Sequence, residues 1–527
     1  MNKSPAESLN KIKTLNKEIY RKNNGKTRIS IQLGQCSISV DTNYLFESIS
    51  KSLPSKSHYL VTTGCDGACY KAPLLNIKHN SDAITEYKKL DLSKTSINEI
   101  FSTSNPTPSD EKFFKLQNRV VLDKCGEIDP YNILEYLEIG GYQALIKTLS
   151  TNTQSIIDLI EKSELTGRGG AYFPVAIKWN SVKKIKSRKK FLVINAEEGE
   201  PGIFKDRHIM EGVPHRIIEG AIIASYATGV EEILLYINAE ANLSYKRMNY
   251  AIEEAYRNNI LGENILGSAL NIEMKIIRGA GGYVCGEETT LLNTVEGYRR
   301  EPRLKPPFPT ESGLWENPTL INNVETLSNV PYIINNGPEV FKKNGINKSF
   351  GTKIISLSGS IKKPGVIEVN MGTSIRNIIY EIGGGINNDK KLQAIAIGGP
   401  SSGILPTSYL DEKIRGGMIH DKGIMLGAGG IIAIDEKANL MELLIKLMSY
   451  NADESCGKCT PCREGTPKMV ELLKKININN FSPKDLEELL YISKIVKFAS
   501  LCGLGQAAGN PIESFNYFFP DIITSNV

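Results

Sequence analysis

The chain has 527 residues, 41% of them hydrophobic and 23% charged, which is ordinary for globular proteins and too long for a single core. Its formal net charge of +5 gives no support to a nucleic-acid partner, and no apolar run reaches the roughly 18 residues of a membrane helix. Nine cysteines without a secretory signal are typical of a reducing compartment, so we expect a cytoplasmic protein whose cysteines are metal ligands or buried thiols.

The first stretch, residues 1–110, begins with a polar, lysine-rich segment that we expect to be disordered. Two β-rich runs follow, "RISIQLGQCSISV" and "HYLVTTGCDGACYKAPLLNI". The first run ends in a loop with Cys36, and the second contains a loop with Cys65 and Cys69. The segment "STSNPTPSDEK", residues 102–112, is predicted to be a linker.

The second stretch, residues 111–350, alternates apolar strands with helical periodicity, which predicts a parallel sheet covered by helices. In "GRGGAYFPVAIKW", Gly167, Gly169 and Gly170 precede a predicted helix that carries Lys178. Backbone N–H groups and one ammonium could cradle a phosphate there, although a flexible turn with a solvated lysine would give the same pattern. The loop "IRGAGGYVCGEETTLL" also follows a strand and opens a helix, but it lacks the dinucleotide-binding spacing.

Polar side chains follow another predicted strand of this stretch. The segment "NAEEGEPGIFKDRH" places Asn195, Glu197, Glu198 and Glu200 at a strand's carboxyl end, where parallel α/β sheets bind ligands. Carboxylates there could bind ribose hydroxyls and would repel the 2′-phosphate of NADP, whereas the alternative is a turn with a helix cap. Downstream, the proline-rigid loop "LKPPFPTESGLW" presents Phe308, either as a stacking surface or as a core anchor.

The third stretch, residues 351–436, contains the hairpin "SGSIKKPGVIEV" and then a helix, which predicts a small α+β module. The fourth, residues 437–527, is predicted to be helical around "ESCGKCTPCREG". Cys456, Cys459 and Cys462 are each two residues apart, a spacing typical of a [4Fe-4S] cluster, whereas zinc sites usually use two separated pairs. The fourth ligand is predicted to be Cys502 in "FASLCGLGQ", where flanking glycines let the backbone donate N–H groups; structural zinc is the alternative.

Taken in order, these motifs resemble the NADH-binding flavoprotein (diaphorase) subunit of respiratory complex I, of soluble NAD-linked and electron-bifurcating hydrogenases, and of formate dehydrogenases. The match covers roughly residues 115 to 527. The resemblance implies an α/β multidomain protein. Its parts would be a thioredoxin-like domain (1–110), a Rossmann-like FMN- and NADH-binding domain (111–350), a β-grasp domain of the soluble-ligand-binding type (351–436) and a helical bundle with a [4Fe-4S] cluster (437–527).

The same resemblance assigns roles to individual residues, with Lys178 near the flavin phosphate and Glu288 as an orienting group. No side chain acts as a catalytic acid or base, because FMN carries the hydride transfer. The implied FMN-binding residues are Gly167, Arg168, Gly169, Gly170, Lys178, Asn195, Glu197, Glu198, Tyr283, Gly286, Glu287, Glu288, Ile321, Asn322 and Asn323. The implied NADH-binding residues are Phe173, Glu200, Glu288 and Phe308, and the cluster ligands are Cys456, Cys459, Cys462 and Cys502.

Two positions depart from the family pattern: Glu197 stands where relatives usually carry aspartate, and Ser181 where an aromatic often helps to stack the nucleotide. These two differences weaken the prediction of nucleotide affinity and of a preference for NAD over NADP. Cys125 and Cys285 are expected to be buried thiols.

The amino-terminal stretch resembles a thioredoxin-like [2Fe-2S] domain, which needs four thiolates. Only Cys36, Cys65 and Cys69 are present, and Ile31 stands where the remaining cysteine would be expected. We favour a degenerate docking domain; the alternative is a cluster completed by an unusual ligand.

We therefore expect a diaphorase subunit that transfers a hydride between NAD(H) and FMN and single electrons between FMN and a [4Fe-4S] cluster. Its partners would be the iron–sulfur and catalytic subunits of a hydrogenase, formate dehydrogenase or bifurcating oxidoreductase, with no nucleic acid and no membrane span. No ferredoxin-type cysteine run follows Cys502, which favours a formate-dehydrogenase-type or other trimmed diaphorase and leaves a shortened bifurcating complex open. The alternatives are a non-catalytic docking scaffold, an NADPH-linked relative and a membrane-associated ion-pumping relative.

Overall fold

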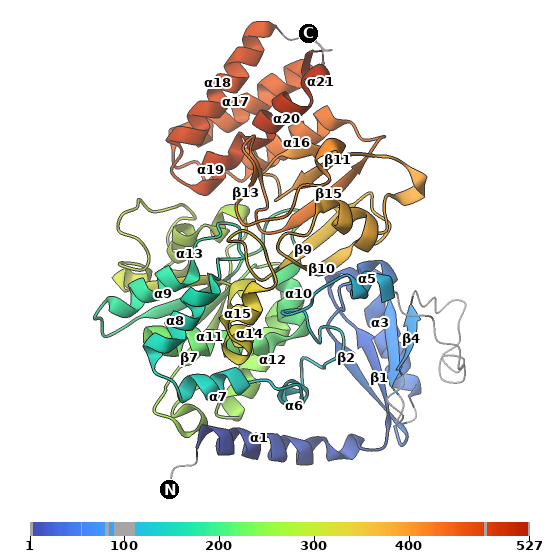
Figure 1. Cartoon of the computed structure of the whole chain (residues 1–527), viewed down its shortest axis with the longest axis vertical. Coiled ribbons are helices and arrows are strands. Elements are labelled where there is room, and N and C mark those ends of the chain that lie inside the picture. Colours follow the sequence, from blue (N-terminus) through green and yellow to red (C-terminus); the bar gives the residue numbers. More distant parts are fainter. Residues whose placement is uncertain (1–3, 54, 79–83, 89–110, 479–481, 525–527) are drawn as a thin grey trace.

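The structure is a computed structural model that describes residues 4–53, 55–78, 84–88, 111–478 and 482–524. Helix α1 lies at one end of the long axis and helices α17 and α18 lie at the other, and the amino-terminal sheet stands beside the central part (Figure 1). The predicted linker, residues 102–112, lies almost entirely outside the described residues. Within the described part of the chain, no helix combines the length and the apolarity that crossing a membrane requires.

The amino-terminal part is a four-stranded sheet in the order β2-β1-β3-β4. Strand β1 pairs in parallel with β2 and antiparallel with β3, and β3 pairs antiparallel with β4. The parallel pair requires a crossover, which α2 and α3 supply. Alternate residues Ile29 and Ile31 of β1 pack against Leu45 and Ile49 of α3. The elements are β1 (Thr27–Gln32), α2 (Gln35–Ile38), α3 (Thr42–Ser52), β2 (His58–Thr63), β3 (Leu74–Lys78) and β4 (Ile84–Lys88).

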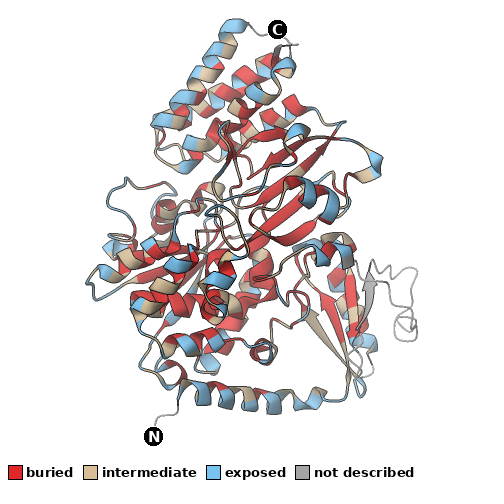
Figure 2. Cartoon of the chain, in the orientation of Figure 1, coloured by how far each residue is buried: buried red, intermediate tan, exposed pale blue. Residues whose placement is uncertain are grey.

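The lysine-rich start forms helix α1 (Pro5–Tyr20), so the expectation of disorder was wrong. Ser4 and Glu7 close a capping box at its first turn. One face packs on the central part of the chain: Leu9 is buried in its core, and Asn16 Nδ2 donates to Asn258 Oδ1 at 2.9 Å. The opposite face is exposed along its length (Figure 2). Composition alone missed the helical repeat that gathers these side chains on one face.

The central part is a parallel sheet in the order β7-β6-β5-β8 with helices on both faces, which confirms the predicted architecture. Alternate strand residues face two separate cores: Leu192 and Ile194 pack with α11 and α14, and Phe191 and Val193 pack with α13. The strands are β5 (Phe191–Ala196), β6 (Glu232–Ile237), β7 (Glu273–Arg278) and β8 (Thr319–Asn323). The helices are α6 (Ile133–Glu138), α7 (Gln143–Leu149), α8 (Thr153–Ser163), α9 (Val175–Lys184), α10 (Lys205–Gly212), α11 (Pro214–Thr228), α12 (Asn242–Arg257), α13 (Glu288–Val295), α14 (Val324–Asn336) and α15 (Pro338–Lys342).

The strand order of this sheet reverses between β5 and β8. The chain adds β6 and then β7 on one side of β5, and it returns to add β8 on the other side. Loops leaving β5 and β8 at their carboxyl ends therefore diverge and leave a crevice, which is where open parallel sheets bind ligands.

The third part is a five-stranded mixed sheet in the order β10-β9-β15-β11-β12, with β9 and β15 parallel. The predicted hairpin is confirmed as the antiparallel pair β9 and β10, and the helix after it is the π-helix Asn377–Ile382. Helix α5 (Glu111–Lys115) packs on this part through Phe113. The strands are β9 (Thr352–Gly359), β10 (Gly365–Asn370), β11 (Leu392–Ile397), β12 (Ile404–Pro406), β13 (Met418–His420), β14 (Ile424–Met425) and β15 (Gly430–Asp435).

The fourth part is helical, as predicted, and forms the far end of the molecule (Figure 1). Its core contains Leu444 and Met448 of α16 with Leu473 of α17 and Val496 of α18. The helices are α16 (Leu440–Asp453), α17 (Thr460–Asn477), α18 (Pro483–Ala499), α19 (Gly503–Ala508), α20 (Asn510–Phe518) and α21 (Pro520–Thr524).

Candidate functional site

A cavity of about 820 Å³ opens at the carboxyl ends of β5 and β8, at the point where the strand order reverses. It is large enough for a mononucleotide-sized ligand and part of a second one. Most of the residues implied for FMN or NADH line it: Gly167, Gly169, Phe173, Lys178, Asn195, Gly286, Glu287, Glu288, Phe308, Ile321, Asn322 and Asn323. Ser181, the position that departs from the family pattern, lines it as well.

Three asparagine amides at the strand ends are held in place by hydrogen bonds. Asn195 Nδ2 donates to the carbonyl of Gly286 at 2.9 Å, which ties β5 to the second glycine loop. Trp179 Nε1 donates to Asn322 Oδ1 at 2.9 Å. Asn323 Oδ1 caps α14 by accepting from the N–H of Glu325 at 3.0 Å. The floor of the cavity is thus preorganised.

The cations of the cavity meet two carboxylates at the start of α13. Lys178 Nζ lies 3.0 Å from Glu288 Oε2, and Lys305 Nζ lies 2.7 Å from Glu288 Oε1 and 3.0 Å from Glu287. Although burial opposes it, the two ammonium groups hold the pKa of Glu288 below its usual value. Lys305 was not predicted, but its place immediately before the rigid Pro-Pro segment was a usable signal.

Glu287 combines a place in the cavity wall with a structural role. Its Oε2 accepts the N–H groups of Thr289 and Thr290, each at 2.9 Å, and thereby caps α13. Its Oε1 faces Lys305. A carboxylate bound in this way is fixed in orientation before any ligand arrives.

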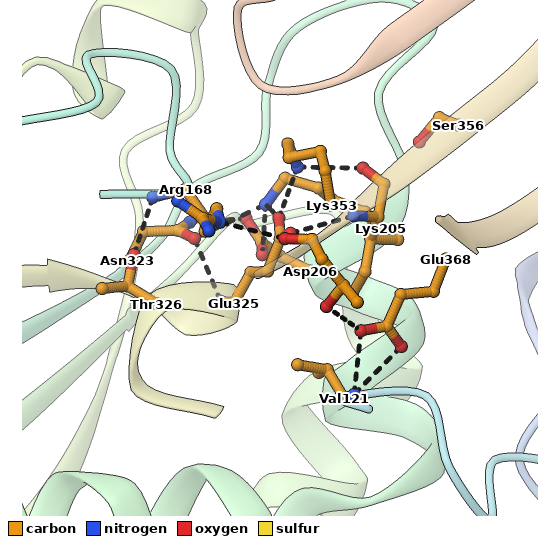
Figure 3. A network of polar contacts seen from close by, with 12 residues as sticks. Val121, Arg168, Lys205, Asp206, Asn323, Glu325, Thr326, Lys353, Ser356 and Glu368 are labelled. Carbon is orange, nitrogen blue, oxygen red and sulfur yellow. Dashed lines mark hydrogen bonds and ion pairs between the residues drawn. The ribbon is translucent and has the colours of Figure 1, made fainter. Parts of the chain in front are cut away.

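A buried network of charges lies beneath the asparagines (Figure 3). Glu325 Oε2 accepts from Lys205 at 3.0 Å and from Lys353 at 2.5 Å, and all three side chains are no more than 1% exposed. Lys205 also pairs with Asp206 at 2.7 Å, and Asp206 accepts from Asn323 Nδ2 at 2.7 Å. The network therefore joins α10, α14 and β9 directly behind the cavity.

Two implied residues of the first glycine loop lie behind the cavity wall. Arg168 is fully buried and donates to the carbonyls of Thr352 and Phe350 at 3.2 and 2.6 Å, which anchors the loop to β9. Gly170 has a φ of +124°, and a Cβ there would lie 3.4 Å from the carbonyl carbon of Gly427. Both residues shape the loop without lining the cavity.

Four further implied residues lie outside the cavity lining: Glu197, Glu198, Glu200 and Tyr283. Glu198 caps α10, because its carboxylate accepts the N–H groups of Asp206 and Arg207 at 2.6 and 2.9 Å. This is the helix-cap arrangement that the sequence left open. Tyr283 donates its hydroxyl to Glu200 at 3.4 Å, and burial raises the pKa of Glu200 to about 8.

Glu197 is 1% exposed, and its Oε2 has no hydrogen-bond partner among the described residues. Burial raises its pKa to about 8, so between roughly pH 4.5 and 8 the folded chain keeps a proton that the unfolded chain loses. Stability falls as pH rises through that window. In the flavin-free chain, Glu197→Gln should unfold like the wild type near pH 5 and be more stable at pH 9, by on the order of 2–4 kcal/mol.

Thermal unfolding recorded from pH 5 to pH 9 tests this expectation. Glu263→Gln, on an exposed loop, is the matched control and should follow the wild-type curve. Parallel curves for wild type and Glu197→Gln would show that the buried carboxyl is not the source of the slope.

The four predicted cluster cysteines converge on one place beside the central part. Cys459 and Cys502 are the N-cap residues of α17 and α19, and Cys462 lies in the first turn of α17. With Cys456 they pack around Val284 and Leu504. Burial raises the pKa of the Cys502 thiol to about 11, and the nearby backbone N–H groups of Gly505 and Leu504 oppose this rise, as expected from the flanking glycines.

The cysteine loop is docked on the second glycine loop. Lys458 Nζ donates to the carbonyl of Pro302 at 2.7 Å, and the N–H of Tyr283 donates to Glu454 at 2.7 Å. Gly503, which follows Cys502 directly, lines the 820 Å³ cavity. The cysteine cluster and the cavity therefore share a wall.

The residues fit the two implied groups. The four cysteines come from two separate helix starts and pack in one cluster, so they offer four thiols to a single group. A four-iron cluster is held by four such thiolates. The cavity in turn offers fixed amides, two lysines and a glycine loop to a phosphorylated ligand.

The remaining cysteines fall into two groups. Cys125 and Cys285 are buried, as predicted. Cys36, Cys65 and Cys69 line one smaller cavity of about 230 Å³ at the edge of the amino-terminal sheet. Ile31 lies in the sheet's apolar core and does not line that cavity.

Three family models match the chain. Residues 160–332 match the Nuo51 FMN-binding domain, residues 354–405 match the SLBB domain, and residues 442–526 match the NADH-ubiquinone oxidoreductase-F iron-sulfur binding region. Each match falls on the part of the chain that carries the corresponding cavity, mixed sheet or cysteine cluster.

Curated relatives are similar over most of the chain. The NADP-reducing hydrogenase subunit HndC of Solidesulfovibrio fructosivorans is 43% identical over 76% of this chain and 81% of its own. An NADH-quinone oxidoreductase F-type subunit of Rhizobium meliloti is 43% identical over 74% of this chain and 93% of its own. Among solved structures, an NAD⁺-reducing [NiFe]-hydrogenase in the H₂-reduced state is 26% identical with a TM-score of 0.67, over 95% of this chain and 84% of that one.

Proposed function

Because the chain belongs to the family of the F-type subunits of NADH-quinone oxidoreductase and of the hydrogenase protein HndC, we propose that it is a diaphorase that exchanges a hydride with NAD(H) and single electrons with a [4Fe-4S] cluster. It is an oxidoreductase subunit with an FMN-binding domain and a 4Fe-4S-binding region, which confirms the resemblance read from the motifs. The relatives are named for both NADH and NADP, and we propose NAD(H) as the substrate here.

The cavity at β5 and β8 would hold the flavin. When bound, FMN accepts two electrons as a hydride and releases them one at a time. We assign Lys178 and Lys305 to the phosphate, since they are the cations of the cavity wall, and the amides of Asn195, Asn322 and Asn323 to the ring and ribityl chain. The buried network behind Asn323 fixes the orientation of that amide through its hydrogen bond to Asp206.

The nicotinamide nucleotide would enter from the open side of the cavity. Phe173 and Phe308 are 46% and 51% exposed and both line it, so their rings are free to stack on a nucleotide. Lys178 already lies over the Phe173 ring, with Nζ 5.8 Å from its centroid. The chain's task in the hydride step is to stack the two rings and exclude water, and Glu288 would orient the nucleotide.

One observation carries the proposal: Gly503 lines the flavin cavity while its neighbour Cys502 faces the cysteine cluster. Glycine at this position leaves no side chain between the cavity and the cluster, and the space around it is open, because a Cβ there would meet nothing within 4 Å. The flavin, which takes up two electrons together, and the cluster, which accepts one at a time, would thus lie on either side of Cys502 and Gly503. Electrons could then pass singly from the flavin to the cluster.

The same proposal assigns a role to each part of the chain and a place in a larger complex. We assign residues 1–110 to a thioredoxin-like domain, 111–350 to FMN and NADH binding, 351–436 to the β-grasp module and 437–527 to the cluster-bearing bundle. The mixed β2-β1-β3-β4 sheet supports the first assignment. We further propose a cytoplasmic multi-subunit complex in which hydrogenase or formate dehydrogenase subunits exchange electrons with this chain.

Replacing Lys178 with methionine removes one phosphate-facing charge while keeping the length of the side chain. Losing a charge-assisted hydrogen bond of about 1.5–3 kcal/mol should weaken FMN binding about 10- to 100-fold. Flavin content and an FMN titration of the apo chain measure this, while iron content should not change. Lys184→Met, at an exposed lysine on the same helix, should keep its flavin.

An anaerobic titration tests the activity itself. NADH should bleach the bound flavin and produce the electron spin resonance signal of a reduced [4Fe-4S] cluster in the wild type. Bleaching by NADPH alone would assign the chain to the NADPH-linked alternative. A chain that binds no flavin even after FMN is supplied would instead be a scaffold, and the diaphorase proposal would fail.

A further inference from the structure

The smaller cavity, of about 230 Å³, lies where the amino-terminal sheet meets helix α10 of the central part. Cys36, Cys65 and Cys69 all line it. The thiols of Cys36 and Cys65 lie near enough to the Cys69 thiol to raise its pKa. The N–H of Gly67 also points at the Cys65 sulfur, at 3.3 Å. The sequence placed these residues in two separate loops, and the fold brings all three sulfurs to one wall.

A histidine from another part of the chain faces the same cavity. His208 lies on α10, is 7% exposed and lines the cavity together with the three cysteines. Its Nε2 is buried and has no hydrogen-bond partner among the described residues. A buried polar nitrogen without a partner costs stability, so its presence beside three thiols needs an explanation.

The position of α10 against the cysteine loops is fixed by a buried arginine. Arg247 Nη1 donates to the carbonyls of Leu33 and Glu211 at 2.9 and 2.6 Å, and its Nη2 donates to the carbonyl of Thr63 at 3.1 Å. It therefore ties the ends of β1 and β2 to the end of α10. The backbones also touch, because a Cβ at Gly64 would lie 2.4 Å from the Cα of Gly212.

The loop with Cys65 and Cys69 is held on its other sides as well. Arg119 Nη1 donates to the carbonyl of Asp66 at 2.5 Å, and the N–H of Val366 on β10 donates to the carbonyl of Gly67 at 2.9 Å. The cavity thus sits at a junction of three parts of the chain. Helix α10, which carries His208, could not move away from the cysteine loops without breaking these contacts.

From these observations we propose that Cys36, Cys65, Cys69 and His208 Nε2 together bind a [2Fe-2S] cluster, with the fourth ligand supplied by the central part of the chain. Neutral imidazole is an established ligand of two-iron clusters. Ile31 cannot take this role, because its side chain has no donor atom and lies fully buried in the apolar core of the sheet. The proposal reverses the preference for a degenerate docking domain and does not depend on the proposed diaphorase activity.

A two-iron cluster suits the site better than a single zinc ion does. A two-iron cluster spreads its four ligands over two metals, so three thiols and one imidazole around the walls of a single cavity suit it. The cavity is also larger than one ion requires. Arg207 lines it and would balance the negative charge of three thiolates, while Glu211, also in the lining, already accepts from the Ser244 hydroxyl at 2.8 Å.

The full chain, reconstituted anaerobically with iron and sulfide, tests the proposal. The wild type should hold about six irons, four in one cluster and two in the other, and show two distinct spin resonance signals on reduction. Pulsed spin resonance of a chain labelled with ¹⁵N-histidine should show a nitrogen coupled directly to the two-iron cluster. No more than about four irons, zinc in place of iron, or no nitrogen coupling would each overturn the proposal.

Variants at His208 separate ligation from folding. His208→Ala should lose about two irons and the two-iron signal while keeping FMN and the [4Fe-4S] signal, which report a folded chain. His208→Cys should restore the cluster at a lower midpoint potential, because a thiolate adds negative charge that imidazole lacks. Glu211→Gln, on the same helix and in the same cavity, is the matched control and should keep the cluster. An intact two-iron signal in His208→Ala, or its loss in Glu211→Gln, would contradict the assignment.

Discussion

Cys502→Ser should leave the chain folded and flavin-bound but without its [4Fe-4S] cluster. Cys502 is the N-cap residue of α19, and serine is a good N-cap, so the helix should persist while the thiolate is lost. A serine hydroxyl does not replace the thiolate as a ligand to iron. A cluster held by only three thiolates loses iron. We expect a loss of about four irons per chain and of the cluster's spin resonance signal.

The same variant should separate the flavin step from electron export. NADH should still bleach the flavin, and ferricyanide, which takes electrons directly from a flavin, should still be reduced at a rate near that of the wild type. Cys285→Ser is the matched control, because its buried thiol donates to the carbonyl of Gly281 at 3.2 Å and a hydroxyl can do the same. If Cys502→Ser kept all its iron, or Cys285→Ser lost it, the ligand assignment would fail.

Glu325→Gln should destabilise the chain by about 3–5 kcal/mol, the usual cost of removing one partner of a buried ion pair. Glu325 is the shared partner of Lys205 and Lys353, and burial lowers the pKa of Lys353 to about 7 even with that carboxylate present. Without it, two buried ammonium groups would face each other (Figure 3). The melting temperature should fall, and FMN should bind more weakly because Asn323 depends on the same network.

A second substitution distinguishes loss of charge balance from loss of packing. Lys353→Met in the Glu325→Gln background removes one of the two stranded charges and should recover part of the stability. Glu471→Gln breaks exposed contacts with Lys468 and Lys475 and should leave the melting temperature unchanged. If the double variant Glu325→Gln/Lys353→Met were less stable than Glu325→Gln alone, the network would stabilise the fold through side-chain packing and not through charge balance.

Local patterns in the sequence predicted much of this site. The glycines before α9, the asparagine at the end of β5 and the cysteine spacing at α17 are short-range signals, since each reflects the geometry of one loop. The alternation of apolar strands with helical repeats predicted the parallel sheet, and the turn in residues 358–369 predicted the hairpin of β9 and β10. The loop signals pointed to Gly167, Gly169, Lys178 and Asn195, whereas Gly286, Asn322 and Asn323 came from the family resemblance. The sequence also predicted that Cys125 and Cys285 would be buried.

The sequence by itself determined which chemical groups the chain offers and in which loops they stand, because spacing along one strand, helix or turn is local. Only the tertiary structure decided which of them meet: Glu198 caps α10 instead of lining the cavity, Lys305 joins Lys178 at Glu288, and His208 faces three cysteines from a distant stretch of the chain. Such pairings depend on where separate elements dock. Docking is set by the packing of whole faces and by buried groups such as Arg247, which no local pattern encodes.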